Sequence, residues 1–235
     1  MPGSDVIWKS AVRKELFEAM TLRERLAAAR LYGIVDLGYV SADRIEAVTA
    51  ELLTGGVDLL QLRAKGCTAD QILEFARRLG PICREAGIPF IVNDHPEIAT
   101  EVGADGVHIG QDDGSLESVR EMVGETMLVG RSTHSFEQAK AAMEGGADYI
   151  GFGPLFPTPT KEGRPGIGLE EVARAEETVG CRIPMFCIGG IKIANLPEIF
   201  SAGARRVVIV SGILRAADVA EEVRRAKCLL AGASD

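Results

Sequence analysis

The sequence repeats one pattern eight times, and this repeat restricts the fold more than any other feature. Each unit has a short apolar run rich in β-branched residues, followed by a segment with the apolar spacing of a helix. The runs are 31–36, 59–63, 90–94, 106–110, 127–132, 149–153, 185–189 and 207–211. Runs that are apolar almost throughout indicate parallel strands covered by helices. Eight such units favour a single closed (β/α)8 barrel, the TIM barrel, over an open doubly wound sheet.

The connections between the runs support this prediction. Segments 68–86 and 115–123 have helical spacing, and the second opens with Ser115 as an N-cap. Phrases of small residues stand just before four of the strands, at 55–58, 102–105, 145–148 and 202–205, where glycine suits a tight turn. Because no linker rich in Pro, Gly or Ser divides the chain, we predict one catalytic domain over residues 31–230.

Residues 1–30 are predicted to form an extra N-terminal helical extension packed on the barrel. Apolar residues recur there with a period of four, at Trp8, Val12, Leu16 and Met20. One interpretation is a helix that covers the bottom of the barrel. The alternative is an amphipathic membrane anchor, which is disfavoured because Glu15, Glu18 and Glu24 are mixed with basic residues on the polar face.

The charge balance restricts the partners. With 26 Lys and Arg against 34 Asp and Glu, the net charge of −8 has the wrong sign for general binding to nucleic acid or anionic membranes. No apolar run approaches the roughly 18 residues of a membrane span. The five cysteines form no CxxC or Cys/His ligand spacing, so free thiols are expected. We therefore expect a cytoplasmic protein with small-molecule substrates, and homo-oligomer formation stays open.

Polar residues gather where the predicted strands end, which is where the active site of such a barrel lies. They stand at 61–65 (QLRAK), 93–95 (NDH), 108–113 (HIGQDD), 132–134 (STH), 158–161 (TPTK), 189–190 (GG) and 211–212 (SG). The glycines after the seventh and eighth runs leave backbone amides uncovered near helix starts, which suits a phosphate group. The alternative is two tight turns that need glycine. A P-loop motif and a GxGxxG motif are both absent.

A second anion site is expected across the same mouth. Arg63 and Lys65 share one face of an extended strand, and Lys161 lies in a loop rich in Gly and Pro, 158–166, that could close as a lid. Asp94 and Asp113 follow neighbouring strands, a placement that suits one Mg²⁺ completed by phosphate oxygens and water. Three cations and a metal would suit a pyrophosphate. Solvated loop charges are the alternative.

Taken in order, these motifs resemble the thiamine phosphate synthase family. The matching stretches are 55–57 with 61–65, 91–94, 103–113, 132–134, 151–154 through 158–161, 188–191 and 210–211. They cover about residues 31–214, and the ordered set is highly specific although each motif alone is weak. The resemblance implies a transferase of thiamine biosynthesis that joins hydroxymethylpyrimidine diphosphate to hydroxyethylthiazole phosphate and releases pyrophosphate.

The resemblance also implies roles for individual residues. Asp94 and Asp113 would bind Mg²⁺. The diphosphate would be held by Arg63, Lys65, Asn93, Ser132 and Lys161. Gln61 and His108 would line the pyrimidine pocket, although a histidine in the middle of a strand is as readily a core residue. The thiazole phosphate would be bound by Thr158, Thr160, Gly190, Val210 and Ser211.

Two positions depart from the family pattern, and two other functions compete. His95 stands where the family commonly has Arg, and Val35 where it usually has Thr, so no role is carried over to either. The segments 130–135 and 210–213 also resemble the paralogous thiazole tautomerase, in which a histidine of the His134 type transfers a proton. A non-catalytic sensor of thiamine precursors is the third reading. The synthase is favoured because all three polar motif sets, 93–94, 111–113 and 158–161, are present.

Overall fold

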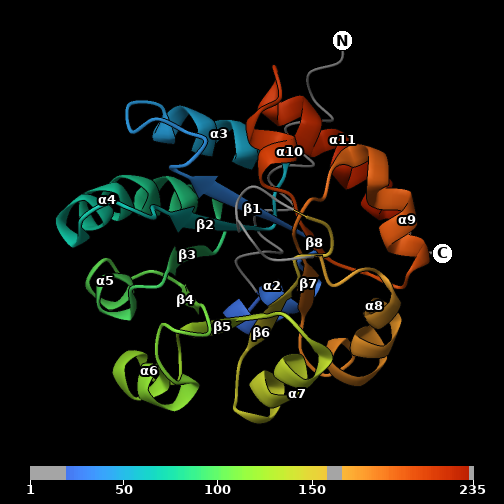
Figure 1. Ribbon diagram of the computed structural model, residues 1–235. Helices are drawn as coiled ribbons and strands as arrows, with labels where there is room; N and C mark the ends of the chain where they lie inside the picture. Colours follow the sequence, from blue (N-terminus) through green and yellow to red (C-terminus); the bar gives the residue numbers. More distant parts are fainter. Residues whose placement is uncertain (1–19, 158–165, 233–235) are drawn as a thin grey trace.

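The computed structural model is a closed barrel of eight parallel strands in the order β1 to β8 (Figure 1), described here for residues 20–157 and 166–232. The strands are β1 Leu31–Asp36, β2 Leu59–Arg63, β3 Phe90–Asn93, β4 Gly106–Ile109, β5 Leu128–Thr133, β6 Tyr149–Phe152, β7 Met185–Cys187 and β8 Val207–Val208. The predicted (β/α)8 barrel is confirmed. The last two strands are shorter than predicted, because Gly189 adopts a φ of 98° after β7 and a helical turn begins at Ser211 after β8.

Helices surround the barrel on its outside, whereas α2 lies at the centre of the view, behind the strands (Figure 1). The helices are α2 Leu22–Ala28, α3 Ile45–Gly55, α4 Ala69–Ala86, α5 Pro96–Glu101, α6 Leu116–Val123, α7 Phe136–Glu144, α8 Glu170–Ala175, α9 Leu196–Ser201, α10 Ser211–Leu214 and α11 Val219–Gly232. A π-helical turn, Glu176–Gly180, follows α8, and a 3-10 turn, Ile193–Asn195, precedes α9. The predicted N-cap is confirmed, since the Ser115 hydroxyl accepts from the Ser118 amide at 3.1 Å.

Helix α4 shows why these segments are helical. Thr68 and Gln71 form a capping box at its start, and Gly87 ends it with a left-handed φ of 70°. Its buried face contains Ile72, Phe75, Ala76, Leu79 and Cys83, which pack on the outside of the sheet. Such amphipathic helices fix each strand from outside, so the strand ends are held in register around one opening.

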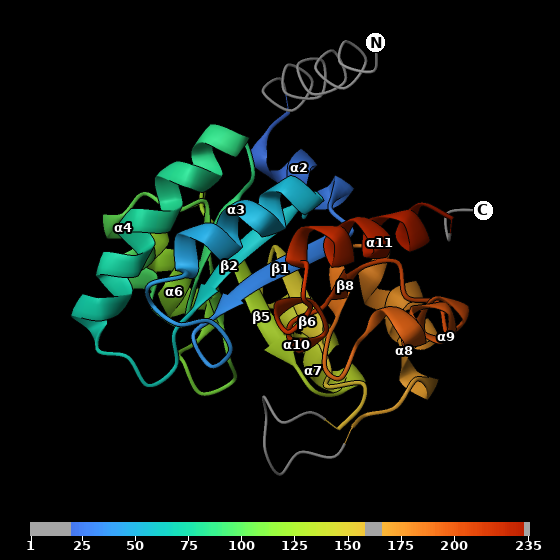
Figure 2. The ribbon, with the colours of Figure 1, turned by 90° about the horizontal axis from the view of Figure 1, so that it is seen from above.

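Two separate apolar clusters stabilise the fold. The larger one lies between the strands and the surrounding helices. The smaller one fills the inside of the barrel, and its buried members are Leu26, Ala29, Tyr32, Ile34, Leu59, Ile91, Leu128, Tyr149, Phe186 and Val208. Leu26 belongs to α2, which lies at the end of the barrel opposite the loops that follow the strands (Figure 2). The residues Trp8, Val12 and Leu16 of the predicted extension lie outside the described part of the chain.

The turns into the strands are pinned by carboxylates. Asp58 accepts from the amides of Arg30 and Leu31 at 3.0 and 2.9 Å and pairs with Lys227 at 2.6 Å. Asp105 likewise accepts from the amide of Phe90, the first residue of β3, and Asp148 accepts from that of Val129, the second residue of β5. These three predicted glycine turns therefore also contain a carboxylate that accepts from the amides at the start of β1, β3 or β5. None of the described helices is long and apolar enough to span a membrane.

Candidate active site at the carboxyl ends of the strands

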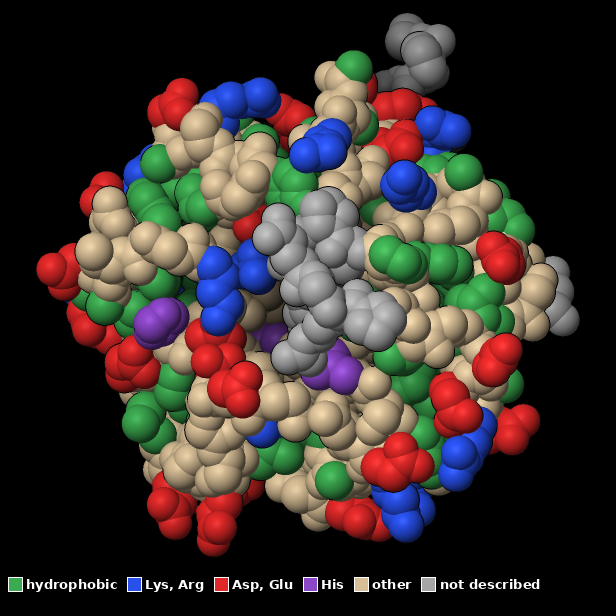
Figure 3. Space-filling model, viewed as in Figure 1, with side chains coloured by type: hydrophobic (Ala, Val, Ile, Leu, Met, Phe, Trp, Pro, Cys, Tyr) green, Lys and Arg blue, Asp and Glu red, His purple; other side chains and the backbone are tan. Residues whose placement is uncertain are grey.

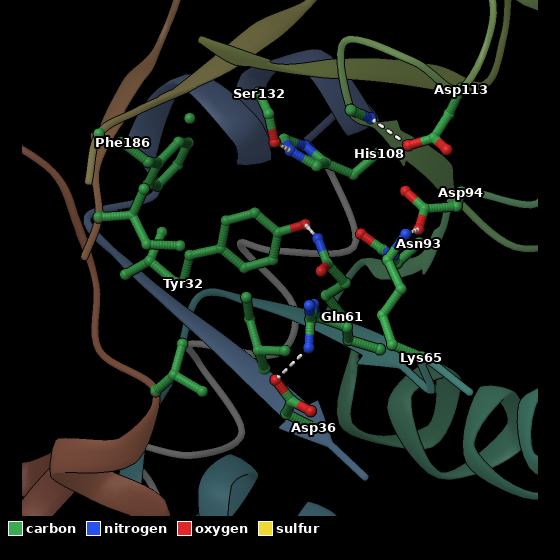
Figure 4. Close-up of a pocket in the computed structure, with 18 of the residues that line it drawn as sticks. Tyr32, Asp36, Gln61, Lys65, Asn93, Asp94, His108, Asp113, Ser132 and Phe186 are labelled. Carbon is green, nitrogen blue, oxygen red and sulfur yellow. Dashed lines mark hydrogen bonds and ion pairs between the residues drawn. The ribbon is translucent and has the colours of Figure 1, made fainter. Parts of the chain in front are cut away.

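A cavity of about 350 Å³ opens at the carboxyl ends of the strands (Figures 3 and 4). Nine of the predicted site residues line it: Gln61, Arg63, Lys65, Asn93, Asp94, His108, Asp113, Ser132 and Val210. Basic and acidic side chains lie next to each other at its mouth (Figure 3). Thr158, Thr160 and Lys161 lie outside the described residues. Gly190 and Ser211 do not line this cavity, and His95 faces Glu97 at 2.9 Å instead.

Asp94 and Asp113 lie together at one side of the mouth, where each affects the pKa of the other. Asp94 has a φ of 64°, a left-handed conformation that Asp tolerates better than most residues. Its carboxylate pairs with the ammonium group of Lys65. Asp113 accepts from the Gly110 amide at 2.9 Å (Figure 4), and a Cβ at Gly110 would lie 2.6 Å from the Asp113 carboxylate. The turn after β4 is thus shaped around this side chain.

The electrostatics of this carboxylate pair favour an added cation. Burial raises the pKa of Asp94, and the neighbouring Asp113 raises it further, against the effect of Lys65. Burial alone would raise the pKa of Asp113 too, but hydrogen bonds from Asp94 and Gly110, together with the charges of Lys65 and Arg131, lower this pKa. Two neighbouring carboxylates repel each other, and a cation bound between them removes this repulsion. The pair fits Mg²⁺, which usually takes one or two carboxylates plus phosphate and water oxygens. Within the described residues no third His, Cys, Asp or Glu joins the pair.

Arg63 is held by Asp36, a residue to which no role was assigned from the sequence. The Arg63 guanidinium donates to Asp36 at 2.8 Å, and the other Asp36 oxygen accepts from the Gly38 amide at 2.9 Å. Figure 4 shows the Asp36 side chain with its ion pair. Asp36 and Arg63 are register partners on β1 and β2. The position of Asp36 at the end of the first strand could have indicated this contact from the sequence, because the neighbouring strand ends in the cation Arg63. Asp36 fixes the position of the guanidinium at the cavity wall.

The floor of the cavity consists of aromatic rings and polar groups. Tyr32, Tyr149 and Phe186 pack edge to face, with ring centroids 5.4–5.9 Å apart. Gln61 donates to the Tyr32 hydroxyl at 2.8 Å, and His108 Nε2 lies 3.0 Å from the Ser132 hydroxyl. Gln61 and His108 thus point into the barrel, which is the orientation that their predicted place in a pocket requires. The two tyrosines were missed, because they lie inside apolar runs.

His134 also lines the cavity. Its Nδ1 lies 2.5 Å from the Gly153 carbonyl, which can only accept, so Nδ1 carries the hydrogen. Its backbone amide donates to Gln138 at 2.8 Å. The ring is therefore oriented by the loop after β6.

The two glycines after β7 have a packing explanation. A Cβ at Gly189 would lie 2.4 Å from Pro154 Cα, and a Cβ at Gly190 would lie 2.7 Å from Phe156 Cβ. Both approaches come from the segment that follows β6. The glycines are thus needed for this close approach, and their predicted role in phosphate binding stays a prediction.

A (β/α)8 barrel with a charged cavity at the carboxyl ends of its strands has the architecture of a barrel enzyme. The family model described as thiamine monophosphate synthase matches residues 31–213, and the chain belongs to this family. A thiamine-phosphate synthase of Thermus thermophilus is 46% identical over 170 residues, which cover 72% of this chain and 81% of that protein.

Other relatives agree over a larger part of the chain. A thiamine-phosphate synthase of Acidothermus cellulolyticus is 42% identical over 214 residues, covering 91% of this chain and all of that protein. The solved structure of a thiamine phosphate pyrophosphorylase from Pyrococcus furiosus superposes with a TM-score of 0.80 at 31% identity, covering 92% of this chain and 100% of that one.

Proposed function

We propose that this chain is a Mg²⁺-dependent transferase that joins hydroxymethylpyrimidine diphosphate to hydroxyethylthiazole phosphate and releases pyrophosphate and thiamine phosphate. Its membership of the family supports the reaction. The observation that carries the site is the carboxylate pair Asp94 and Asp113, which lies beside Lys65 at the mouth of the cavity.

The reaction needs charge stabilisation more than a nucleophile. An electron-rich aminopyrimidine can release pyrophosphate and leave a carbocation, which the thiazole nitrogen then captures. Arg63, Lys65, Asn93 and Ser132 line one cavity, where they would hold the leaving diphosphate and neutralise its growing charge. Mg²⁺ bound by Asp94 and Asp113 would supply Lewis-acid stabilisation of the diphosphate oxygens. No side chain has to form a covalent bond.

The organic groups would lie deeper and to one side. Gln61 and His108 form polar parts of the cavity floor and would face the pyrimidine. The thiazole phosphate would be held by the loops after β7 and β8, through Gly190, Val210 and Ser211, together with Thr158 and Thr160. Lys161 would close over the diphosphate and exclude water from the cation. The aromatic rings of the cavity floor support this placement, because their apolar faces would exclude water from a carbocation.

The enzyme is proposed to work in the cytoplasm. All five cysteines are free thiols in the structure, and two of them, Cys83 and Cys187, are buried. Free thiols are the ordinary state in a reducing compartment.

The direct test mixes purified protein, both phosphorylated substrates and Mg²⁺, and follows thiamine phosphate by thiochrome fluorescence after oxidation. Product that disappears on addition of EDTA is the expected result. Asp94→Asn and Asp113→Asn should each lower kcat by about 100-fold, since each removes charge stabilisation of the transition state. Asp70→Asn, on the exposed start of α4, is the matched control and should retain activity.

Three outcomes would contradict the proposal. Full activity of Asp94→Asn would show that the metal site is elsewhere. Isomerisation of a thiazole phosphate without metal would favour the tautomerase chemistry. Thermal stabilisation by the two substrates without product would indicate a sensor.

A further inference from the structure

A chain of buried polar groups crosses the inside of the barrel, and Figure 4 shows its two ends, Gln61 with Tyr32 and His108 with Ser132. Gln61 Nε2 lies 2.8 Å from the Tyr32 hydroxyl, which lies 3.0 Å from the Tyr149 hydroxyl. The Tyr149 hydroxyl lies 3.3 Å from His108 Nδ1, and His108 Nε2 lies 3.0 Å from the Ser132 hydroxyl. Five residues from strands β2, β1, β6, β4 and β5 thus form one continuous series of hydrogen bonds, which we call the polar chain.

The polar chain has a direction because the atom that begins it, Gln61 Nε2, can only donate. The amide nitrogen of Gln61 gives a hydrogen to Tyr32, so the Tyr32 hydroxyl passes its own single hydrogen to Tyr149. Tyr149 then donates to His108 Nδ1, which must be unprotonated. The ring hydrogen of neutral His108 therefore lies on Nε2 and is donated to the Ser132 oxygen. The Ser132 hydroxyl hydrogen is left to point into the cavity.

The opposite direction leaves one buried hydrogen without an acceptor. If Ser132 donated to His108 and the ring donated to Tyr149, Tyr32 would receive hydrogen bonds from both of its neighbours. Its own hydrogen would then have no partner, since the described residues offer Tyr32 only Gln61 and Tyr149. Tyr32 is only 2% exposed. Leaving a buried hydroxyl without an acceptor is unfavourable. It should shift the equilibrium between the two directions of donation toward the first direction by roughly 5- to 150-fold.

Packing holds the two phenols in this geometry. The Tyr149 ring packs against Tyr32 and Phe186, and it lies at 5.4 Å from the His108 ring. Gly130 is the register partner of Tyr149, and a Cβ there would lie 2.1 Å from the Tyr149 Cζ atom. Burial raises the pKa of both phenols, so each keeps its hydrogen at neutral pH.

We propose that Tyr32 and Tyr149 are positioning residues, which transmit the polarity of the Gln61 amide across the barrel and present the Ser132 hydroxyl hydrogen to an anionic ligand. Neutral His108, with its hydrogen on Nε2, is the last relay before Ser132. The identity of the ligand as a diphosphate rests on the proposed function. The direction of the polar chain rests only on the arrangement of the protein's own groups.

The first test is the tautomer of His108 in the full chain without substrates. Long-range ¹H–¹⁵N correlation spectra at about pH 8, above the usual histidine pKa, distinguish protonated from unprotonated ring nitrogens. The chain has three histidines, and the signals of His108 are those that disappear in His108→Asn. We expect Nε2 to be protonated and Nδ1 unprotonated. A hydrogen on Nδ1 would overturn the proposal.

The second test reverses the direction of hydrogen donation by changing Gln61, the first residue of the polar chain. In Gln61→Glu the new carboxyl group can only accept once it is ionised, so Tyr32 then donates to it, Tyr149 donates to Tyr32, and the His108 hydrogen moves to Nδ1. Because position 61 is buried and burial raises a carboxyl pKa, the spectra of this variant are recorded from about pH 8 to about pH 10. An unchanged His108 tautomer in this variant would refute the proposal. Tyr149→Phe keeps the ring and removes the relay, and a mixture of both tautomers is expected. Tyr39→Phe, which lies outside the barrel interior, is the control and should leave the spectrum unchanged.

Kinetics then link the polar chain to the ligand. Tyr149→Phe should raise KM for the pyrimidine diphosphate about 5- to 20-fold, because the Ser132 hydrogen is no longer directed at the anion, and should change KM for the thiazole phosphate by less than about twofold. Equal changes in both values would contradict this link. The spectra need no turnover, so a protein that makes no thiamine phosphate leaves the tautomer result interpretable.

Discussion

The Asp36–Arg63 ion pair should stabilise the fold far more than an exposed pair of similar length. The two groups are 2.8 Å apart, and their side chains are 2% and 21% exposed. The pair Arg77–Glu101 has a distance of 2.6 Å, but its side chains are 63% and 51% exposed. The two pairs therefore differ chiefly in how well water solvates the charges, which makes the second a matched control for the first.

The expected magnitudes follow from what each substitution leaves behind. Arg63→Met leaves a buried carboxylate whose remaining donor is the Gly38 amide. Breaking a fully buried pair costs about 3–5 kcal/mol, and partial access of water at the Arg63 side reduces our estimate to about 2–3 kcal/mol. Asp36→Asn keeps the acceptor for Gly38 and leaves a guanidinium that water reaches, so about 1–2 kcal/mol is expected. The double variant should lose about 1.5 kcal/mol less than the sum, since neither charge remains.

Urea unfolding followed by circular dichroism measures these free energies. The cycle is completed with Arg77→Met, Glu101→Gln and their double variant, whose coupling energy should stay below about 1 kcal/mol. If the Asp36 and Arg63 substitutions are additive within about 0.5 kcal/mol, the two charges do not stabilise each other in the folded protein. Equal coupling energies for the buried and the exposed pair would refute the expected effect of burial.

Two further predictions concern groups outside the cavity mouth. Burial raises the pKa of Glu176 against the effect of Arg206. A carboxyl group whose pKa is raised in the folded state stabilises the fold at low pH, and this stabilisation is lost as the pH rises through the folded-state pKa. The free energy of unfolding relative to Glu176→Gln should therefore increase from about pH 7 to about pH 5, and urea titrations showing a decrease would disprove it. Gly130→Ala should cost about 1–3 kcal/mol because it displaces Tyr149, whereas Gly80→Ala, with ordinary contacts in α4, should stabilise by about 0.5–1 kcal/mol. Thermal denaturation of both variants checks the pair, and equal signs would count against the steric argument.

Much of the barrel and its mouth could be predicted from the sequence for a physical reason. Parallel strands place all their carboxyl ends at one opening, so the residue that ends a run is located once the run is recognised. Lys65, Asp94 and Asp113 lie together for this reason, although they are far apart in the chain. The lengths of the last two strands were less predictable, since backbone φ at Gly189 and the turn at Ser211 ended them early.

The sequence by itself determined the repeat, the single barrel and the charged residues at its mouth, because periodicity and strand ends are local features. Only the tertiary structure decided which residues face inward. Tyr32 and Tyr149 lie in runs that are apolar on both faces, so nothing local distinguishes the inside of the barrel from the helix-covered outside. The closure and register of the barrel bring Tyr149 opposite Gly130 and Asp36 opposite Arg63. These pairings depend on all eight strands at once, which no single segment of sequence encodes.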